Sequence, residues 1–345
     1  MIEVNREGEV WVFAEQHNGQ LEDTPIELMS KARHLADTLG VKLAAALLGN
    51  KVKELGEKLI HYGADKVYLA EHPKLQAYQT NSYAKVMYDL IHKYTPQIVL
   101  YGATAAGRDL APRIASATKA GLTADCTDLQ IGDHQTVKDK KLHKNLLFQI
   151  RPAFGGNIIA TIINHDRWPQ MATVREGVMA PAELDSEHKG EIVEEKISLA
   201  EVDLPLEILE EQKRVKKVDL KAARIIVAGG AGVGSKDNFQ LIWELANCLG
   251  GAPAATRAAV DLGFIDHDHQ VGQTGTTVRP SLYIAVGISG QIQHQAGMSQ
   301  SQKIIAVNSD PDAPIFNIAH YKILGDLNTV VPMMIKTIKE KGIKD

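Results

Sequence analysis

Cysteine is almost absent from this sequence, which contains only Cys126 and Cys248 among its 345 residues. The two lie far apart and form no CxxC motif, so the sequence supports neither a disulfide framework nor a zinc site. The closest pair among the scattered histidines is His267 and His269, with no cysteine nearby. We therefore predict no metal site, expect this histidine pair to face solvent, and infer a reducing compartment.

Long apolar runs and a strong net charge are also missing. No segment reaches the roughly 18 apolar residues of a membrane-spanning helix, and the N-terminus resembles neither a signal peptide nor an organellar leader. The formal net charge of −4 at pH 7 provides no broad cationic field, so we predict no nucleic-acid partner. We expect a cytoplasmic protein that is not membrane-embedded.

Two domains are expected from the length, because a single core usually stops growing near about 250 residues. The first half alternates short apolar runs with helical patterns, beginning at 10–14 and 26–39, which predicts a mostly parallel sheet covered on both faces. We predict an α/β fold: an N-terminal parallel-sheet α/β domain at 1–182, a charge-dense linker at 183–221, and a C-terminal Rossmann-like domain at 222–345.

Polar residues gather at three places in the C-terminal domain. Thr256 and Arg257 offer a hydroxyl and a permanent cation, while 270–275 offer two amides, a hydroxyl and two glycines that let a ligand approach the backbone. Residues 289–294 add donors and a titratable ring beyond the apolar strand 282–286, where open α/β sheets bind ligands. This set favours a dinucleotide with a redox ring.

A glycine turn opens the same domain. Gly230, Gly232 and Gly234 follow the apolar strand 225–228 and precede a helical pattern, a context in which a phosphate can bind a helix N-terminus. The spacing departs from GxGxxG, so a simple turn is an equal alternative. A nicotinamide-dependent dehydrogenase would need an acidic residue about 20 positions later, and 250–255 contains none.

The order and spacing of motifs over nearly the whole chain closely resemble the α subunit of electron-transferring flavoproteins. The C-terminal motifs are Thr256–Asp261, Gln270–Gly275, Leu282–His294, Gly297-Met298, Asn308 and Ala313–Phe316. The N-terminal motifs are Gly102–Thr104, Gly107–Arg113, Gly121–Thr127, Arg151–Asn157 and Pro169–Arg175.

This resemblance implies a cofactor and a partner. The C-terminal domain would be an FAD-binding domain, and the N-terminal domain would serve assembly with a β subunit that binds AMP or a second FAD. The residues that match the family's FAD contacts are Gly230, Gly232, Thr256, Arg257, Gln270, Val271, Gly272, Gln273, Thr274, Ser289, Gly290, Gln291, Ile292, Gln293, His294, Asn308, Asp326 and Leu327.

Two of these residues are predicted, by resemblance, to tune the flavin. Arg257 would lie against the isoalloxazine ring and favour the reduced, anionic flavin, and His294 would donate to the pyrimidine carbonyl. Three departures from the family pattern concern the adenosine end. Ala231 stands where many relatives have arginine, and His320 and Lys322 replace the usual aspartate and glycine.

Electron transfer is the function that the resemblance implies, in two versions. In electron bifurcation, NADH reduces a β-subunit flavin, which sends one electron to ferredoxin or flavodoxin and the other through the FAD of this chain to an acyl-CoA dehydrogenase. The motifs at 107–113 and 121–127 look like those of anaerobe-type and bifurcating members and favour this version. In the alternative, a single FAD carries electrons from acyl-CoA dehydrogenases to a quinone oxidoreductase. A nucleotide-binding regulatory protein without redox function is a third interpretation.

Charged residues in the N-terminal half suggest catalysis at first sight. Arg108, Asp109, Arg113, Asp125 and Arg151 are accompanied by no Ser/His/Asp or Cys/His order, so we predict structural roles for them. Asp109 would complement a helix dipole, and Arg113 and Arg151 would pair with carboxylates or with a partner subunit.

Overall fold

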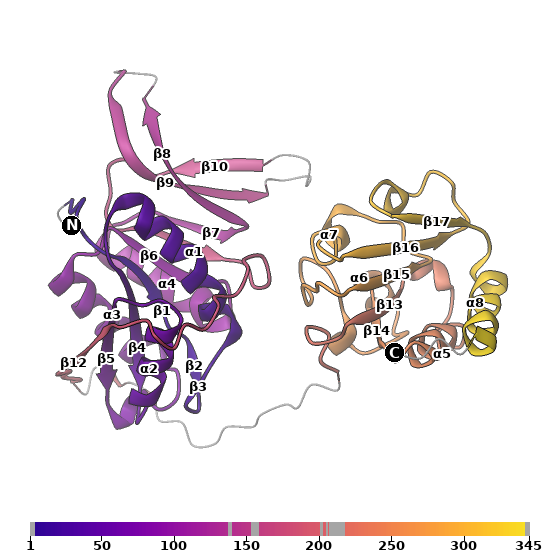
Figure 1. Cartoon of the computed structure of the whole chain (residues 1–345), viewed down its shortest axis with the longest axis horizontal. Helices are drawn as coiled ribbons and strands as arrows, with labels where there is room; N and C mark the ends of the chain where they lie inside the picture. The colour runs from indigo at the N-terminus through magenta and orange to yellow at the C-terminus, as the bar shows by residue number, and fades with distance from the viewer. Residues whose placement is uncertain are drawn as a thin grey trace. The chain divides into compact units, whose positions relative to one another are not determined.

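The structure is a computed structural model that describes residues 4–136, 140–152, 159–200, 203, 204, 206 and 218–341. The chain divides into two units, Met1–Glu210 and Glu211–Asp345 (Figure 1). The division falls inside the stretch 183–221 that the sequence predicts to be a linker. Parts of that stretch and of the Arg151–Asn157 motif lie outside the described residues.

A seven-stranded sheet with only parallel pairings forms the centre of the first unit. In sheet order its strands are β12 (Glu191–Glu195), β5 (Lys66–Glu71), β4 (Leu43–Gly49), β1 (Val10–Phe13), β6 (Ile98–Gly102), β11 (Gln170–Val174) and β7 (Leu122–Cys126). Along β1, Val10 and Val12 enter one apolar core and Trp11 and Phe13 enter the other. Burial on both faces explains why these strands are continuous apolar runs.

Four helices and a 3₁₀ turn accompany this sheet. They are α1 (Asp23–Leu39), α2 (Lys53–His61), η1 (Pro73–Leu75), α3 (Thr80–Tyr94) and α4 (Ala105–Thr118). Leu28 of α1 and Leu59 of α2 belong to one core, and Met87 of α3 and Ile114 of α4 belong to the other. One helix pair therefore covers each face of the sheet.

Strand β12 lies in the stretch that its charge density assigns to the linker. It pairs with β5 at the edge of the sheet, where Ile192 packs on one core and Val193 on the other. Glu191 and Glu194 are exposed, whereas the side chain of Glu195 is only 8% exposed and forms an ion pair with Lys93 at 2.8 Å. Charged side chains are usual on edge strands because they discourage further strand pairing. The high charge density of this stretch therefore concealed a short strand that has only two apolar residues.

A three-stranded antiparallel sheet extends from the same unit (Figure 1). Its order is β10 (Ile159–Ile163), β9 (Leu142–Pro152) and β8 (Asp128–Gln135). A small hairpin pairs β2 (Gln16–His17) with β3 (Gln20–Leu21). Residues 137–139 lie outside the described residues.

Asp125 and Arg175 form a largely buried ion pair in this unit. Arg175 donates to both carboxylate oxygens, with Nε at 3.2 Å and Nη2 at 2.5 Å, and Arg108 contacts the same carboxylate at 3.5 Å. Burial alone would raise the pKa of Asp125, but the hydrogen bond and the charge of Arg175 outweigh it, so the pKa is lowered. Asp109 accepts from Tyr78 at 2.8 Å.

Replacing Arg175 with Met should lower the free energy of unfolding of the first unit by about 3 kcal/mol, because a half-buried carboxylate would lose its bidentate partner. The expected loss is large because only 9% of the Arg175 side chain is exposed.

The matched control is Arg108→Met, since that side chain is 60% exposed and its pair with the carboxylate is longer. It should cost less than about 1 kcal/mol. Urea unfolding can be followed by the emission of Trp11 and Trp168 in a Trp243→Phe background, which removes the tryptophan of the second unit. Equal losses in both variants would contradict the dominance of Arg175.

A five-stranded sheet, again with only parallel pairings, forms the second unit. In sheet order its strands are β14 (Ala252–Ala255), β13 (Ile225–Gly229), β15 (Leu282–Val286), β16 (Lys303–Asn308) and β17 (Tyr321–Leu324). Its helices are α5 (Gln240–Cys248), α6 (Arg257–Asp261), α7 (Ile292–Gln295) and α8 (Leu327–Lys341), and its 3₁₀ turns are η3 (Ala231–Val233), η4 (His267–His269) and η5 (Pro314–Asn317). The two parallel sheets confirm the predicted α/β fold class.

Apolar clusters lie on both faces of this second sheet as well. Ile242 of α5 and Val331 of α8 pack on one face, where they meet Ile284 of β15. On the other face Tyr283 of β15 packs in a cluster with Met298. Side chains along β15 point alternately to the two faces of the sheet. One face is covered by α5 and α8, and the other mainly by loops.

Within the described residues, no helix is long and apolar enough to cross a membrane. No group of three or more His, Cys, Asp or Glu side chains there is arranged to hold a metal ion. His269 is buried, with Nδ1 2.8 Å from the Pro253 carbonyl oxygen, so the expectation that it faces solvent is wrong.

Candidate functional site

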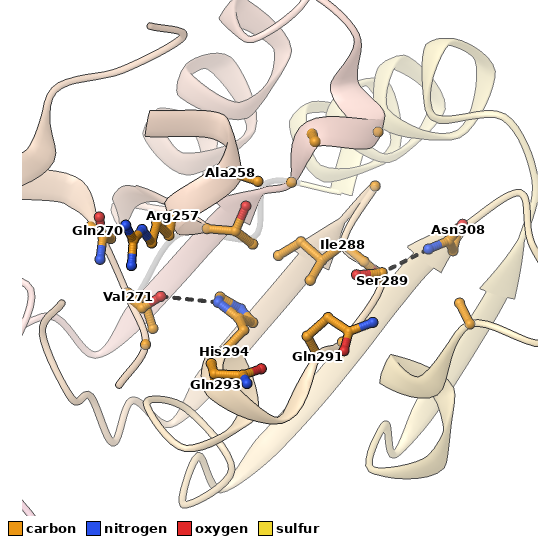
Figure 2. Close-up of a pocket in the computed structure, with 18 of the residues that line it drawn as sticks. Arg257, Ala258, Gln270, Val271, Ile288, Ser289, Gln291, Gln293, His294 and Asn308 are labelled. Atoms are coloured by element: carbon orange, nitrogen blue, oxygen red, sulfur yellow. Dashed lines mark hydrogen bonds between the residues drawn. The ribbon is translucent and has the colours of Figure 1, made fainter. Parts of the chain in front are cut away.

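A cavity of about 400 Å³ lies where the loops after four strands of the second unit meet. In chain order β13 comes first, and β14 and β15 then pair with its two opposite edges. Open α/β sheets bind ligands at such a switch point, beyond the carboxyl ends of the strands. Figure 2 shows how the side chains surround this space.

Most of the residues predicted from the sequence come together here. Those that line the cavity are Gly230, Gly232, Thr256, Arg257, Gln270, Val271, Gly272, Gln273, Thr274, Ser289, Gly290, Gln291, Gln293, His294 and Asn308.

Three predicted residues are placed elsewhere. Ile292 begins α7 but does not line the cavity. Asp326 precedes α8, where its carboxylate accepts the backbone N–H of Asn328 at 2.9 Å, and Leu327 packs into the core beneath that helix. Their positions are explained by the start of α8, without a ligand.

One wall of the cavity is a contact between two backbone turns. The N–H of Gly230 donates to the Val286 carbonyl at 2.9 Å, and the N–H of Gly232 donates to the Gly287 carbonyl at 3.1 Å. A Cβ on Gly230 would lie 2.2 Å from the Gly287 oxygen, and one on Gly232 would lie 2.7 Å from it. Any larger residue would force the turns after β13 and β15 apart.

This contact corrects the expected role of the glycine turn. The turn forms η3, and α5 begins only at Gln240, so the glycines do not open a helix directly. The N–H groups of Gly230 and Gly232 are used between the two turns, so a phosphate at this turn would have to contact other donors. Because they have no side chains, these glycines instead allow the turns after β13 and β15 to approach each other closely.

The loop after β15 forms the floor beside this contact. Gly290 has a φ of +85°, which side-chain-bearing residues rarely adopt, and a Cβ there would lie 2.2 Å from the Ile315 nitrogen. The backbone carbonyl of Ser289 accepts the Ile315 N–H at 3.0 Å, and Gln295 donates its side-chain amide to the Gly290 carbonyl at 2.7 Å. The loop is therefore fixed by both η5 and α7.

The polar loop 270–274 is hydrogen-bonded to α7, and the two together form one wall of the cavity. Gln273 donates its backbone N–H to the Gln293 carbonyl at 2.7 Å. The buried Gln270 donates its side-chain amide to the Thr274 hydroxyl at 3.0 Å. These bonds order the amides and hydroxyls at the cavity wall before any ligand arrives.

His294 lies at the centre of this wall and is only 7% exposed. Its Nδ1 is 3.0 Å from the Val271 carbonyl oxygen (Figure 2), and its Nε2 is 3.1 Å from the Tyr283 hydroxyl. Desolvation by burial lowers its pKa to about 4, so the ring is neutral near pH 7. Donation to a flavin carbonyl, as predicted from the sequence, would require one of these protein contacts to change.

Arg257 brings a positive charge to the mouth of the cavity. It begins α6, whose N-cap Thr256 accepts the Ala259 N–H at 3.4 Å. Its side chain is 69% exposed, and Nε lies 3.4 Å from the Asp261 carboxylate. An exposed pair of this length holds the guanidinium weakly, so a ligand can compete for it.

The opposite end of the cavity follows β16. Asn308 donates its side-chain amide to the Ile288 carbonyl at 2.9 Å, a bond visible in Figure 2, and accepts the Asp310 N–H at 3.0 Å. Lining residues that the sequence interpretation did not include are Ala258, Gly287, Ile288, Asp310 and Ala313. Four of them lie in loops beyond strand ends and Ala258 lies in α6, which follows β14, so their position after strands was the signal that could have found them.

Of the three departures from the family pattern, Ala231 lines the cavity, whereas His320 and Lys322 do not. His320 accepts the Ile304 N–H through Nδ1 at 3.0 Å, which ties β16 to β17. The histidine at this position therefore affects the packing of β16 and β17, and it does not change the lining of the cavity.

The chemistry of the lining fits FAD. Gly230 and Gly232 line the cavity beside Ala231 and carry no side chains, so a pyrophosphate can approach the backbone of this turn closely. The amides and hydroxyl of the loop 270–274 provide donors and acceptors for a heteroaromatic ring, and Arg257 provides a cation for an anionic group.

Comparison with known proteins agrees with this chemistry. The model of the electron transfer flavoprotein domain matches residues 10–200, and that of the electron transfer flavoprotein FAD-binding domain matches 219–299. An electron transfer flavoprotein subunit alpha from Thermoanaerobacterium thermosaccharolyticum is 51% identical over 96% of this chain and 98% of its own length. This chain belongs to the electron transfer flavoprotein α-subunit family. FAD is its cofactor, and its partner in the family is a β subunit.

Other relatives of this α subunit carry names of larger complexes. The acryloyl-CoA reductase electron transfer subunit beta of Anaerotignum propionicum is 45% identical over 98% of this chain and 97% of that protein. The LctC subunit of the lactate dehydrogenase (NAD⁺, ferredoxin) of Acetobacterium woodii is 40% identical, over 96% of this chain and 77% of that protein.

The buried histidine predicts a pH dependence of stability. Because the pKa of His294 is about 4 in the folded chain and 6.5 by reference, the unfolded chain takes up the proton first as pH falls. Stability should be complete above pH 6.5 and decrease by about 3 kcal/mol by pH 4.

His294→Gln is the matched variant, because glutamine can accept from Tyr283 and donate to Val271 without titrating. Trp243, the tryptophan of the second unit, reports its urea unfolding in a Trp11→Phe, Trp168→Phe background. The variant should show a flatter pH profile between pH 6.5 and 4. Profiles of identical slope would show that His294 is not buried as a neutral ring.

Proposed function

We propose that this α subunit holds one FAD in the cavity of its second unit and acts, with its β subunit, in flavin-based electron bifurcation. The convergence of polar groups and glycines at the carboxyl ends of β13, β14, β15 and β16 carries the proposal. FAD supplies the redox chemistry, because its isoalloxazine ring accepts and releases electrons.

The residues of the chain would bind and orient this cofactor. The turn at Gly230 and Gly232 would hold the pyrophosphate, the wall formed by loop 270–274 and α7 would hold the ring, and Asn308 would contact the adenosine. Ser289 to Gln291 close the floor between them. Because these groups are ordered by hydrogen bonds within the protein, little reorganisation is needed when the cofactor binds.

We assign the first unit to assembly with the β subunit, and the protein to the cytoplasm. The near absence of cysteine supports the compartment. The pairing of Asp125 with Arg175 and the contacts of Asp109 with Tyr78 give charged residues of this unit structural roles, which supports assembly rather than catalysis.

Bifurcation is favoured over simple transfer by the names of the relatives. One is an electron transfer subunit of an acryloyl-CoA reductase, and another is a subunit of a lactate dehydrogenase that uses NAD⁺ and ferredoxin. By analogy, electrons from NADH would enter through a β-subunit flavin and leave toward ferredoxin or flavodoxin and toward an acyl-CoA dehydrogenase-type flavoprotein. A single-FAD carrier that supplies a quinone oxidoreductase is the alternative. A nicotinamide-dependent dehydrogenase is disfavoured, because Thr256 and not an acid follows β14.

Co-purification with the β subunit tests bifurcation. Two FAD molecules per heterodimer are expected, together with ferredoxin reduction by NADH that requires both the acyl-CoA dehydrogenase and an enoyl-CoA acceptor. One FAD with one AMP, and no reduction of ferredoxin, would assign this protein to simple electron transfer instead.

Arg257→Gln should lower the reduction potential of the bound flavin, because the variant removes a cation that favours the reduced, anionic form. Solvent screens a side chain that is 69% exposed, so the expected shift is on the order of 50 mV, about 1 kcal/mol for one electron. Arg257→Lys should shift the potential in the same direction, but less.

The matched control is Arg279→Gln, which removes the same charge from an exposed position that does not line the cavity. Spectroelectrochemical titration at equal FAD content measures all variants. Equal potentials for the Arg257 and Arg279 variants would mean that Arg257 has no special influence on the flavin.

A further inference from the structure

Tyr283 has a hydroxyl in a place where a phenylalanine would be expected. It is the second residue of β15, it has no exposed surface, and it packs in a cluster with Val271, Ile288 and Met298. Burying a hydroxyl among apolar groups is unfavourable unless it is hydrogen-bonded. Its partner is His294, whose Nε2 lies 3.1 Å from the hydroxyl oxygen.

The direction of each hydrogen bond follows from chemistry. The Val271 carbonyl can only accept, so the ring of His294 must carry its proton on Nδ1, which lies 3.0 Å from that oxygen. Nε2 of the neutral ring then has only a lone pair to offer, and the Tyr283 hydroxyl donates to it. The phenol, the imidazole and the carbonyl form one chain of two hydrogen bonds with a fixed direction.

This chain of hydrogen bonds joins three parts of the cofactor cavity. It begins on β15, passes through α7 and ends on the loop 270–274. Val271 also donates its own N–H to the Ala255 carbonyl at 2.9 Å, at the end of β14. Val271 is therefore held from both sides, once by the sheet and once by His294.

We propose that Tyr283 is a positioning residue of the cofactor cavity, which keeps the His294 proton on Nδ1 and thereby holds the loop 270–274 against α7. The inference rests on the proposed function, since it assumes that this cavity receives FAD. Tyr283 does not line the cavity, so it acts through His294.

In a chain without the Tyr283 hydroxyl, the buried Nε2 of His294 would lack a hydrogen-bond donor. If the proton then moved from Nδ1 to Nε2, the lone pair of Nδ1 would face a lone pair of the Val271 carbonyl oxygen. The ring would have to turn, and the loop 270–274 would lose one of its two attachments to α7, keeping the Gln273–Gln293 bond.

The first test needs no variant. Nitrogen-15 NMR of histidine-labelled protein, assigned with His294→Gln in the complete heterodimer, reports which ring nitrogen carries the proton. Protonation at Nδ1 is expected. Protonation at Nε2 would overturn the proposal, because the hydroxyl could not then be the donor.

The second test is Tyr283→Phe in the same heterodimer. FAD release should become about tenfold faster, as expected for one lost buried hydrogen bond, and amide exchange of the loop 270–274 should speed up. Tyr321→Phe is the matched control, because that ring is 59% exposed on β17. Equal FAD release and loop exchange in the two variants would overturn the proposal.

A double-mutant cycle distinguishes this proposal from the assignment of the cavity itself. If Tyr283 acts through His294, Tyr283→Phe should have little further effect on FAD release in a His294→Ala background. Additive effects would overturn the positioning role alone. If instead FAD binds normally in His294→Ala and in Arg257→Gln without any change of potential, the assignment of the cofactor cavity fails as well.

Discussion

The second unit depends on a backbone contact between the turns that follow β13 and β15. The N–H groups of Gly230 and Gly232 donate to the carbonyls of Val286 and Gly287, and no side chain separates the two turns. Their contact sets the distance between the loops on either side of the switch point. The polar loops 270–274 and 289–291 line the space beside this contact. The position of the cavity therefore depends on glycines at 230 and 232, where any side chain would push the two turns apart.

Continuous apolar runs were enough to predict the parallel sheets, because strands covered on both faces have no polar face to interrupt the pattern. Strand β12 was missed because three of its five residues are glutamates, a composition that resembles a solvated linker. His269 was expected at the surface, but its ring is buried between the Pro253 carbonyl and Trp243. Composition describes the average surroundings of a segment and cannot show such local pairings.

For the cavity, too, the sequence predicted which residues gather but not which contacts they make. Motif positions after strand ends predicted most of the lining, because the carboxyl ends of parallel strands meet at one edge of a sheet. What each residue does there was harder to predict. The N–H groups of Gly230 and Gly232 and both ring nitrogens of His294 contact protein atoms, which depends on residues such as Tyr283 that lie at a distance in the sequence. Asp326 matched a motif but sits at the start of a helix.

The division of the chain into Met1–Glu210 and Glu211–Asp345 gives calorimetry a particular use. A ligand raises the stability of the folded state that binds it by mass action, and the cavity lies entirely within the second unit. Cofactor added to the chain therefore stabilises that unit directly and the first unit only through whatever energetic coupling joins them. Cofactor binding changes the melting temperature of each unit. The ratio of the change in the first unit to that in the second measures how strongly cofactor binding is coupled to the unit assigned to assembly.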